Sequence, residues 1–241
     1  MPKFQNDSNK KSNMKKIFFT ATISFLFAIA YGQRLSQITL TTGGNADIIT
    51  FLTEDAVYVN ITKDGKIIDW GIEPKTGRYN NYPGRLDPYM GRVEYFSEAD
   101  NEDTRGKVKY IGRTAITYYT ANENAAFKGK IKSIGTNFFD YYDSYGDEAF
   151  KGKIKTAGSL SFSYYSSYEN EAFKGKFRNI GPSILTYYAS FDDKAYRGKI
   201  KSIDSQKFTY YSSYDRPEFQ GSMKGGGQMQ FTISGIKYLI R

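Results

Sequence analysis

The chain has 241 residues and a formal net charge of +9, with 39% hydrophobic and 17% aromatic residues. This composition excludes wholesale disorder, because enough apolar surface is present to build a folded core. The absence of Cys excludes disulfides and the lipidated Cys of a bacterial lipoprotein. The joint absence of His and Cys removes the commonest zinc ligands, the usual catalytic base and the thiol nucleophile.

The N-terminal segment of the chain has the pattern of an export signal. Met14-Lys15-Lys16 precedes the apolar run 17–30, and Ala30-Tyr31-Gly32 closes it with small residues. The run is shorter than the ~20 residues that a membrane-spanning helix needs. We therefore expect an upstream extension at 1–13, a signal peptide at 14–32, and an exported protein of a bacterial cell envelope. Its location would be the periplasm, the cell surface or the extracellular space.

Residues 33–104 are predicted to form a β-rich N-terminal cap with degenerate repeats. β-branched and aromatic residues dominate the stretches 48–52 and 57–61, and Asp64-Gly65 is a turn signal before another apolar stretch. Gly84-Arg85-Leu86 and Tyr95-Phe96 resemble a degenerate copy of the repeat that follows.

Residues 105–219 are five tandem copies of one 23-residue unit. A glycine recurs without a slip, a tyrosine pair follows it, and an aromatic residue closes each unit. These positions are Gly106, Gly129, Gly152, Gly175, Gly198 and Gly221, the pairs 118/119, 141/142, 164/165, 187/188 and 210/211, and Phe127, Phe150, Phe173, Tyr196 and Phe219. Three registers that stay locked over five copies indicate a repeat architecture.

Each unit predicts a β-hairpin. The stretch 128–132 begins a first strand, and 139–145 has the β-forming residues of a second strand. Counting by two then divides the side chains between two faces of a sheet. The apolar face holds Ile131, Ser133, Phe139, Tyr141 and Tyr145, and the opposite face, which is basic and carries tyrosines, holds Lys130, Lys132 and Tyr142.

Two all-β architectures accommodate such units: a β-meander, in which every strand pairs antiparallel with the next, and a β-solenoid, in which identical positions stack. A solenoid would place the repeated lysines about 4.8 Å apart, whereas a meander doubles the gap to ~10 Å. Charge repulsion favours the meander. The predicted fold is an elongated, single-layer, twisted antiparallel β-meander, with a β-solenoid as the alternative. Residues 220–241 are expected to cap it as a C-terminal half-repeat.

The repeat resembles the MORN repeat, which has the same length and also forms a hairpin. The resemblance rests on Phe127-Lys128-Gly129-Lys130-Ile131 and its copies, which match the family's opening Y-E-G-E-W, and it covers about residues 105–221. Basic residues replace the acidic ones beside Gly, and the family's later G-x-G is missing. The resemblance implies a twisted sheet that serves as a binding or assembly platform, and it carries over no catalytic residue.

Two rows of side chains are candidate ligand-binding residues, and we expect no catalytic, metal-binding or cofactor-binding residue. Tyrosine offers a flat apolar face and a hydroxyl group, and repeated lysines attract anions. The candidates are Tyr119, Tyr142, Tyr165, Tyr188 and Tyr211, with Lys130, Lys153, Lys176 and Lys199. The alternative is that the tyrosines pack across strands and that the lysines provide solubility and protect the sheet edges.

These features predict a secreted, non-enzymatic repeat protein that acts as a multivalent binding or scaffold platform. The expected partner is an acidic polysaccharide, an anionic lipid surface or a protein. The alternatives are an outer-membrane β-barrel and a purely structural protein that assembles through its sheet edges into homo-oligomers. Removal of residues 1–32, which carry five Lys and one Asp, leaves a net charge of about +5, too small a surplus to predict nucleic-acid binding.

Overall fold

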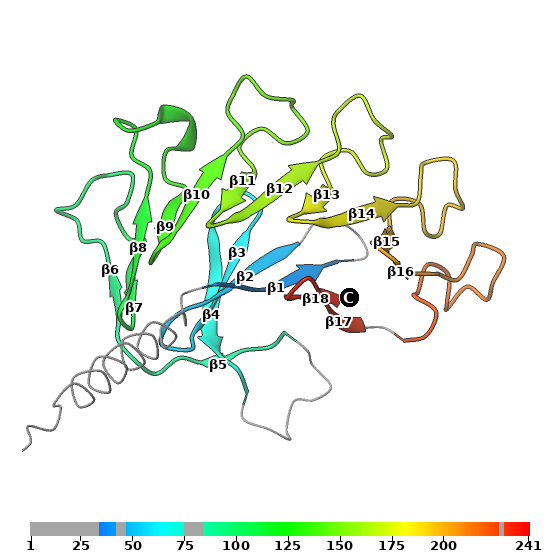
Figure 1. Ribbon diagram of the computed structural model, residues 1–241, viewed down its shortest axis with the longest axis horizontal. Helices are drawn as coiled ribbons and strands as arrows, with labels where there is room; N and C mark the ends of the chain where they lie inside the picture. The colour runs from blue at the N-terminus through cyan, green and yellow to red at the C-terminus, as the bar shows by residue number, and fades with distance from the viewer. Residues whose placement is uncertain (1–33, 42–46, 75–83, 227–228) are drawn as a thin grey trace, which may run out of the picture. The chain divides into compact units, whose positions relative to one another are not determined.

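Nearly every element in the part of the chain that the structure describes is a β-strand, as the repeat pattern predicts. The computed structural model describes residues 34–41, 47–74, 84–226 and 229–241. The predicted extension at 1–13 and signal peptide at 14–32 lie outside these described residues. The described strands form two sheets, and one short 3-10 helix, Ala125–Phe127, lies in a loop of the second sheet (Figure 1).

The first sheet combines strands from both ends of the chain, and we call it the terminal sheet. Its seven strands lie in the order β17-β18-β1-β2-β3-β4-β5. They are β1 (Arg34–Leu40), β2 (Ile48–Leu52), β3 (Tyr58–Thr62), β4 (Ile67–Ile72), β5 (Asp87–Pro88), β17 (Met229–Ile233) and β18 (Ile236–Ile240). Neighbouring strands are antiparallel except β1 and β18, which pair in parallel with Gln37 opposite Lys237.

The second sheet, which we call the repeat sheet, is a meander of eleven consecutive strands. They are β6 (Val93–Tyr95), β7 (Val108–Ile111), β8 (Thr114–Tyr118), β9 (Ile131–Ile134), β10 (Asn137–Tyr141), β11 (Ile154–Ala157), β12 (Leu160–Tyr164), β13 (Phe177–Ile180), β14 (Ser183–Tyr187), β15 (Ile200–Ile203) and β16 (Gln206–Lys207). Each strand pairs antiparallel with the next, which confirms the predicted meander over the solenoid. β6 and β16 stand at opposite ends of the order, so the sheet is open and does not close into a barrel.

The segments that flank the repeats on either side join different sheets. Upstream of the repeats, β6 extends the repeat sheet, and Gly106 N–H donates to Phe96 O as Gly129 N–H donates to Tyr119 O. The degenerate copy around Phe96 therefore belongs to the array. Residues 220–241 were expected to cap the array as a half-repeat. The first of them do continue it, because Met223 bridges to Tyr210 and Lys224 N–H donates to Thr209 O, whereas β17 and β18 lie in the terminal sheet.

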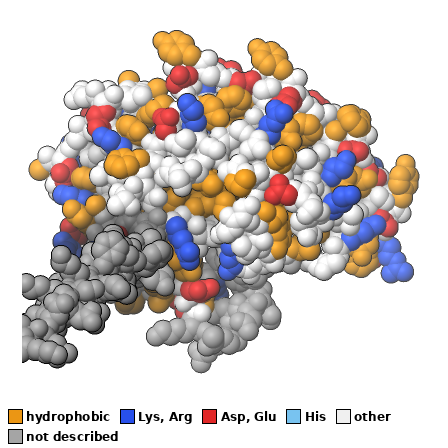
Figure 2. All heavy atoms as spheres, viewed as in Figure 1, with side chains coloured by type: hydrophobic (Ala, Val, Ile, Leu, Met, Phe, Trp, Pro, Cys, Tyr) orange, Lys and Arg blue, Asp and Glu red, His pale blue; other side chains and the backbone are white. Residues whose placement is uncertain are grey.

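A loop connects each hairpin to the next, and its closure explains the glycine that recurs once in every repeat. Gly152 N–H donates to Tyr142 O, and Tyr142 N–H donates to Lys153 O. Gly175 has a φ of +71°, and a Cβ there would lie 2.6 Å from Ala149 O. Only glycine fits such a position without strain. The loops follow one edge of the repeat sheet (Figure 1), and hydrophobic side chains project from the molecular surface along that edge (Figure 2).

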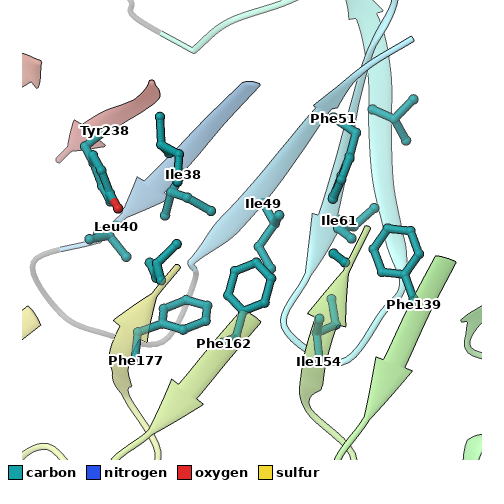
Figure 3. Close-up of a cluster of buried hydrophobic side chains, with 14 of the residues drawn as sticks. Ile38, Leu40, Ile49, Phe51, Ile61, Phe139, Ile154, Phe162, Phe177 and Tyr238 are labelled. Carbon is teal, nitrogen blue, oxygen red and sulfur yellow. The ribbon is translucent and has the colours of Figure 1, made fainter. Parts of the chain in front are cut away.

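The hydrophobic core lies between the two sheets. Phe139 of the repeat sheet packs edge-on against Phe51 of the terminal sheet, with ring centroids 5.1 Å apart. Further apolar side chains from both sheets meet in the same layer (Figure 3). We call the face of the repeat sheet toward this core its inner face and the opposite one its outer face. The repeat sheet is one layer of strands, as expected, and the terminal sheet adds a second layer that the sequence does not predict.

A β-bulge recurs at the same place in every repeat. Asp140 lies opposite Thr156 and Tyr141 lies opposite Ile154, so Lys155 has no partner. Corresponding shifts leave one residue unpaired in β7, β9, β13 and β15. The unpaired residue is basic each time. These bulge residues are Lys109, Lys132, Lys155, Arg178 and Lys201.

Phe138 and Phe139 test the assignment of the two faces. Phe139 is 1% exposed in the core, whereas Phe138 is 65% exposed on the outer face. We expect Phe139→Ala to lower the free energy of unfolding by about 3–5 kcal/mol, because it leaves a cavity against Phe51. Phe138→Ala should change it by less than about 0.5 kcal/mol. Urea denaturation measures both, and equal losses would contradict the two-layer core.

Candidate functional site

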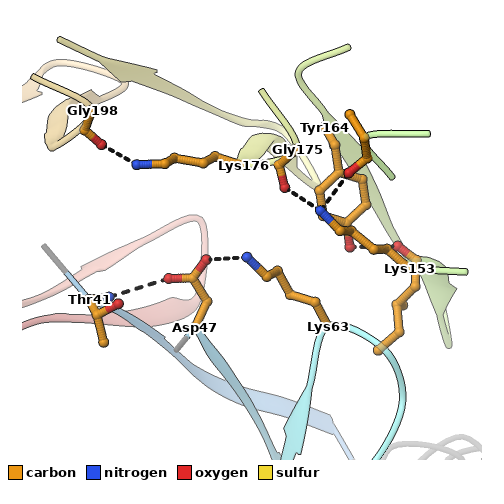
Figure 4. Close-up of polar contacts among 10 residues, drawn as sticks. Thr41, Asp47, Lys63, Lys153, Tyr164, Gly175, Lys176 and Gly198 are labelled. Atoms are coloured by element: carbon orange, nitrogen blue, oxygen red, sulfur yellow. Dashed lines mark hydrogen bonds and ion pairs between the residues drawn. The ribbon is translucent and has the colours of Figure 1, made fainter. Parts of the chain in front are cut away.

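The candidate lysines Lys130, Lys153, Lys176 and Lys199 connect each repeat to the next. Their amino groups donate to the carbonyl oxygen of the glycine that opens the following repeat. Figure 4 shows this contact for Lys153 and Lys176. The Nζ–O distances are 2.8 Å from Lys130 to Gly152, 2.6 Å from Lys153 to Gly175 and 2.5 Å from Lys199 to Gly221. Lys107 makes the same contact with Gly129. We call these five side chains the lysine ladder.

The lysine ladder lies on the inner side of the repeat sheet. Lys153 stands over the ring of Tyr164, 5.3 Å from its centroid, and the other four lysines occupy equivalent places. Lys130 also donates to Asp64 O in the turn between β3 and β4 of the terminal sheet. Burial lowers the pKa of every ladder lysine, and lowers that of Lys153 to about 8. These amino groups therefore hold successive repeats together, and that of Lys130 also connects the two sheets.

The candidate tyrosines are half-buried, and their hydroxyl groups also serve the fold. Tyr119, Tyr142, Tyr165 and Tyr188 each donate to a backbone carbonyl of the following repeat, at 2.8–3.0 Å. The ring of Tyr142 packs 4.7 Å from Phe150 and 5.9 Å from Tyr164. Tyr211 packs against Phe219. One edge of each ring is thus fixed, which leaves the remaining ring surface for contacts on the outer face.

The structure separates the two candidate rows, so the prediction that Lys130 and Tyr142 share one open face is wrong. Lys130 precedes β9, so the alternation of a strand does not apply to it. The bulge causes a second departure, inside the strand. Counting by two assumes a regular strand, but the unpaired Lys132 reverses the alternation within β9. Ser133 therefore shares the outer face with its exposed partner Phe138, instead of the inner face with Ile131.

Four of the five cations that stand over the candidate tyrosines are bulge residues. Lys132 lies 5.8 Å from the ring centroid of Tyr119, and Lys155 lies 6.0 Å from that of Tyr142. The series continues with Arg178 over Tyr165, Lys201 over Tyr188 and Lys224 over Tyr211, at 5.2–5.6 Å. We call these five cation–ring pairs the outer row. These cations could have been found from the sequence, since a basic residue also recurs at this fixed position of each repeat.

Part of the charge in the outer row is balanced by carboxylates. Lys132 forms an ion pair with Glu123, Lys155 lies 4.0 Å from Asp140, and Arg178 lies 3.5 Å from Glu169. Within the described residues, Lys201 and Lys224 form no ion pair. The positive charge that remains available to a ligand is therefore greatest at the C-terminal end of the row.

The outer face is hollowed beside the first of these cations. A depression of about 590 Å³ lies between the first two loops and is lined by Phe96, Thr117, Glu123, Lys132 and Phe138 among others. Thr117 and Ser133 share a hydrogen bond of 2.7 Å there. The hollow offers a cation, hydroxyl groups and an exposed aromatic ring side by side, which is a combination suited to a polar ring-shaped ligand.

Tyr145 has an unexpected position. Alternation predicts it on the apolar face with Phe139 and Tyr141, but it lies at the tip of a loop and is 96% exposed. The strand ends at Tyr141, so the period of two no longer applies at Tyr145. Exposed aromatic residues at equivalent loop positions were also missed by sequence reasoning.

Comparison with protein-family models, curated proteins and solved structures gives no match. Within the described segments, no helix is long and apolar enough to cross a membrane. In the same segments, no group of three or more acidic side chains is arranged to hold a metal ion. The site must therefore be interpreted from its own geometry.

Lys153 and Lys155, which are close neighbours in the sequence, separate structural from surface lysines. Lys153→Met removes hydrogen bonds of 2.6 Å to Gly175 O and 2.7 Å to Ala149 O. We expect it to lower the free energy of unfolding by about 1–3 kcal/mol, because two carbonyl groups lose a charged donor. Lys155→Met removes only exposed contacts and should change it by less than about 0.5 kcal/mol. Similar losses in urea denaturation would contradict the separation of the two rows.

The lowered pKa of Lys153 predicts that the free energy of unfolding depends on pH. Between pH 8 and about 10 the unfolded chain binds this proton more than the folded protein does, so the free energy of unfolding rises with pH. Above about pH 10, ionisation of the inner tyrosines reverses the trend, because burial raises the pKa of Tyr141. Lys153→Met should reduce the rise, whereas Lys155→Met should leave it unchanged. The measurement is urea denaturation of the parent chain and both variants at pH 7–10. If the free energy of unfolding changes with pH in the same way in all three, the prediction is refuted.

Proposed function

We propose that the protein is an exported, non-enzymatic platform that binds an acidic polysaccharide in a multivalent manner through its outer row. The observation that carries this proposal is the recurrence of one cation over one tyrosine ring in each of five successive units. The export signal at 14–32 lies outside the described residues and enters as an expectation from the sequence. The resemblance to the MORN repeat, also an expectation from the sequence, supports a binding platform.

The spacing of the outer row suits a ligand that repeats its charges. Consecutive members are separated by two strands, or ~10 Å along the sheet. A polymer that carries one anionic group per few sugar units can contact several members at once. Linked contacts raise the effective affinity well above that of one contact. A single small anion would engage one cation and gain nothing from the repetition.

Each outer pair combines two kinds of contact. The ammonium or guanidinium group attracts a carboxylate or sulfate group, and the half-buried tyrosine offers an apolar ring surface beside it. The tyrosine is held by its hydrogen bond to the next repeat, as Tyr142 is by Phe162 O at 3.0 Å. A fixed ring loses little conformational entropy on binding. This combination supports an acidic sugar polymer over a simple polyanion.

Affinity electrophoresis tests the proposal. The full chain should be retarded in gels that contain alginate or polygalacturonate. The variant K155Q/R178Q/K201Q should bind at least about tenfold more weakly, because each lost surface cation removes about 1 kcal/mol. The loop variant K151Q/K174Q/K194Q is the control, since it changes the net charge equally in the same part of the chain.

The outcomes separate the outer row from general charge attraction. The loop variant should keep the affinity of the parent chain, and retardation should weaken as salt concentration rises. Equal losses in both variants would show that net charge alone is responsible. Binding to anionic vesicles without binding to either polysaccharide would replace the proposed ligand with a lipid surface.

A further inference from the structure

A second surface of the repeats consists of aromatic rings at the loop tips. One fully exposed aromatic side chain stands in each of four successive loops, always at the same position of the repeat. They are Tyr145, Tyr168, Phe191 and Tyr214, with exposed fractions of 96%, 96%, 87% and 95%. We call these four residues the tip row. Figure 2 shows hydrophobic side chains projecting from the surface where the loops lie.

The fold does not account for the tip row. An aromatic ring contributes to stability by burying apolar surface, and these four rings bury almost none. The first repeat has Asn122 at the equivalent position, within an equally closed loop. A loop of this shape therefore does not need an aromatic residue at its tip. Large exposed apolar groups in a regular arrangement mark an interaction surface.

Hydrogen bonds between neighbouring loops fix the positions of the rings. The Asp147 carboxylate accepts from Ala149 N–H in its own loop and from Ser167 N–H in the next loop, at 2.8 and 3.0 Å. The other connections are Asn170 to Ser190 and Asp193 to Ser213, both at 3.0 Å. Desolvation raises the pKa of Asp147, but its hydrogen bonds from backbone N–H groups outweigh that effect and lower it, as they lower the pKa of Asp193. Both contacts therefore persist in mild acid, and the tip row is preorganised along the sheet edge.

The charge around the tip row is opposite to that of the outer row. The four loops, residues 143–151, 166–174, 189–197 and 212–220, contain nine Asp and Glu against five Lys and Arg, a net charge of −4. Like charges repel, so an acidic polysaccharide or an anionic membrane is disfavoured at this edge. Carboxylates instead accept hydrogen bonds from hydroxyl groups. An uncharged, hydroxyl-rich ligand with apolar ring faces fits this environment.

We infer that the tip row binds a neutral polysaccharide by stacking sugar rings on Tyr145, Tyr168, Phe191 and Tyr214. The C–H face of a sugar ring packs on the flat aromatic face, and the loop carboxylates accept hydrogen bonds from its hydroxyl groups. A repeating ligand matches a repeating row, as it does on the outer face. This inference goes beyond the proposed function, because it assigns a second ligand class to a second surface. A chain with both surfaces would connect neutral and acidic polymers.

The test is affinity electrophoresis of the full chain in gels that contain hydroxyethylcellulose, xyloglucan, mixed-linkage β-glucan or dextran. We expect retardation by at least one of these polysaccharides. The variant Y145S/Y168S/F191S/Y214S should migrate as in an empty gel, and each single substitution should weaken binding by roughly twofold to tenfold. Its unfolding midpoint in urea should equal that of the parent chain, because the four rings bury almost no surface that could be lost.

Two controls distinguish this surface from the outer row. K155Q/R178Q/K201Q should lose affinity for alginate but keep affinity for the neutral polysaccharide, and the fourfold tip variant should show the reverse. I184S removes an exposed apolar side chain from the outer face and should leave neutral binding unchanged. Failure of one surface therefore leaves the other testable.

Four results would overturn the inference. One is the absence of retardation by all four neutral polysaccharides, and another is retardation that survives in the fourfold variant. A third is self-association in analytical ultracentrifugation that disappears in the fourfold variant without any glycan binding, which would assign the rings to a second copy of the chain. The fourth is binding to phosphatidylcholine vesicles in place of glycans, which would assign them to a membrane surface.

Discussion

The repeat sheet has one apolar face, and the rest of the structure depends on how that face is covered. The terminal sheet covers it, and the parallel pairing of β1 with β18 adds the C-terminal strands to that sheet across almost the whole length of the described chain. The turn between β3 and β4 then accepts backbone hydrogen bonds from Ile131 and Ile154 through Gly65 O and Lys63 O. With the inner face occupied in this way, the outer face and the loop edge remain for partners.

The bulge connects this packing to the surface chemistry. It leaves one basic residue per repeat unpaired and directs it outward, while the base two positions earlier turns inward to the next glycine. Lys153 and Lys155 therefore look equivalent in the sequence but differ in burial and in partners. The bulge also leaves Ile154 N–H without a partner in the neighbouring strand. This group donates instead to Lys63 O, in the turn of the terminal sheet, at 2.8 Å. One local irregularity thus serves both the core and the outer row.

Much of the fold was predictable from local pattern. The 23-residue period, the hairpins, the antiparallel meander and the inward positions of Ile131, Phe139 and Tyr141 all follow from repetition and alternation. The pairing of β18 with β1 was not predictable, because nothing local in a short strand indicates a partner at the other end of the chain. The face of Lys130 was missed because this residue precedes β9, and that of Ser133 because an extra residue in a strand is invisible to a count by two. Tyr145 was assigned to the core because its strand was taken too far.

The most direct test of this account is a disulfide between the chain ends. The sequence contains no Cys, so Q37C and K237C can pair only with each other within one chain. Their backbones are direct neighbours across β1 and β18, within the ~4.4–6.8 Å that a disulfide spans. Thr232 lies one strand further away, at about 10 Å, so Q37C/T232C is the matched control. We predict that mild oxidation of the folded monomer closes the Q37C/K237C bridge and not the control, and an unbridged Q37C/K237C chain would contradict the parallel pairing of β1 with β18.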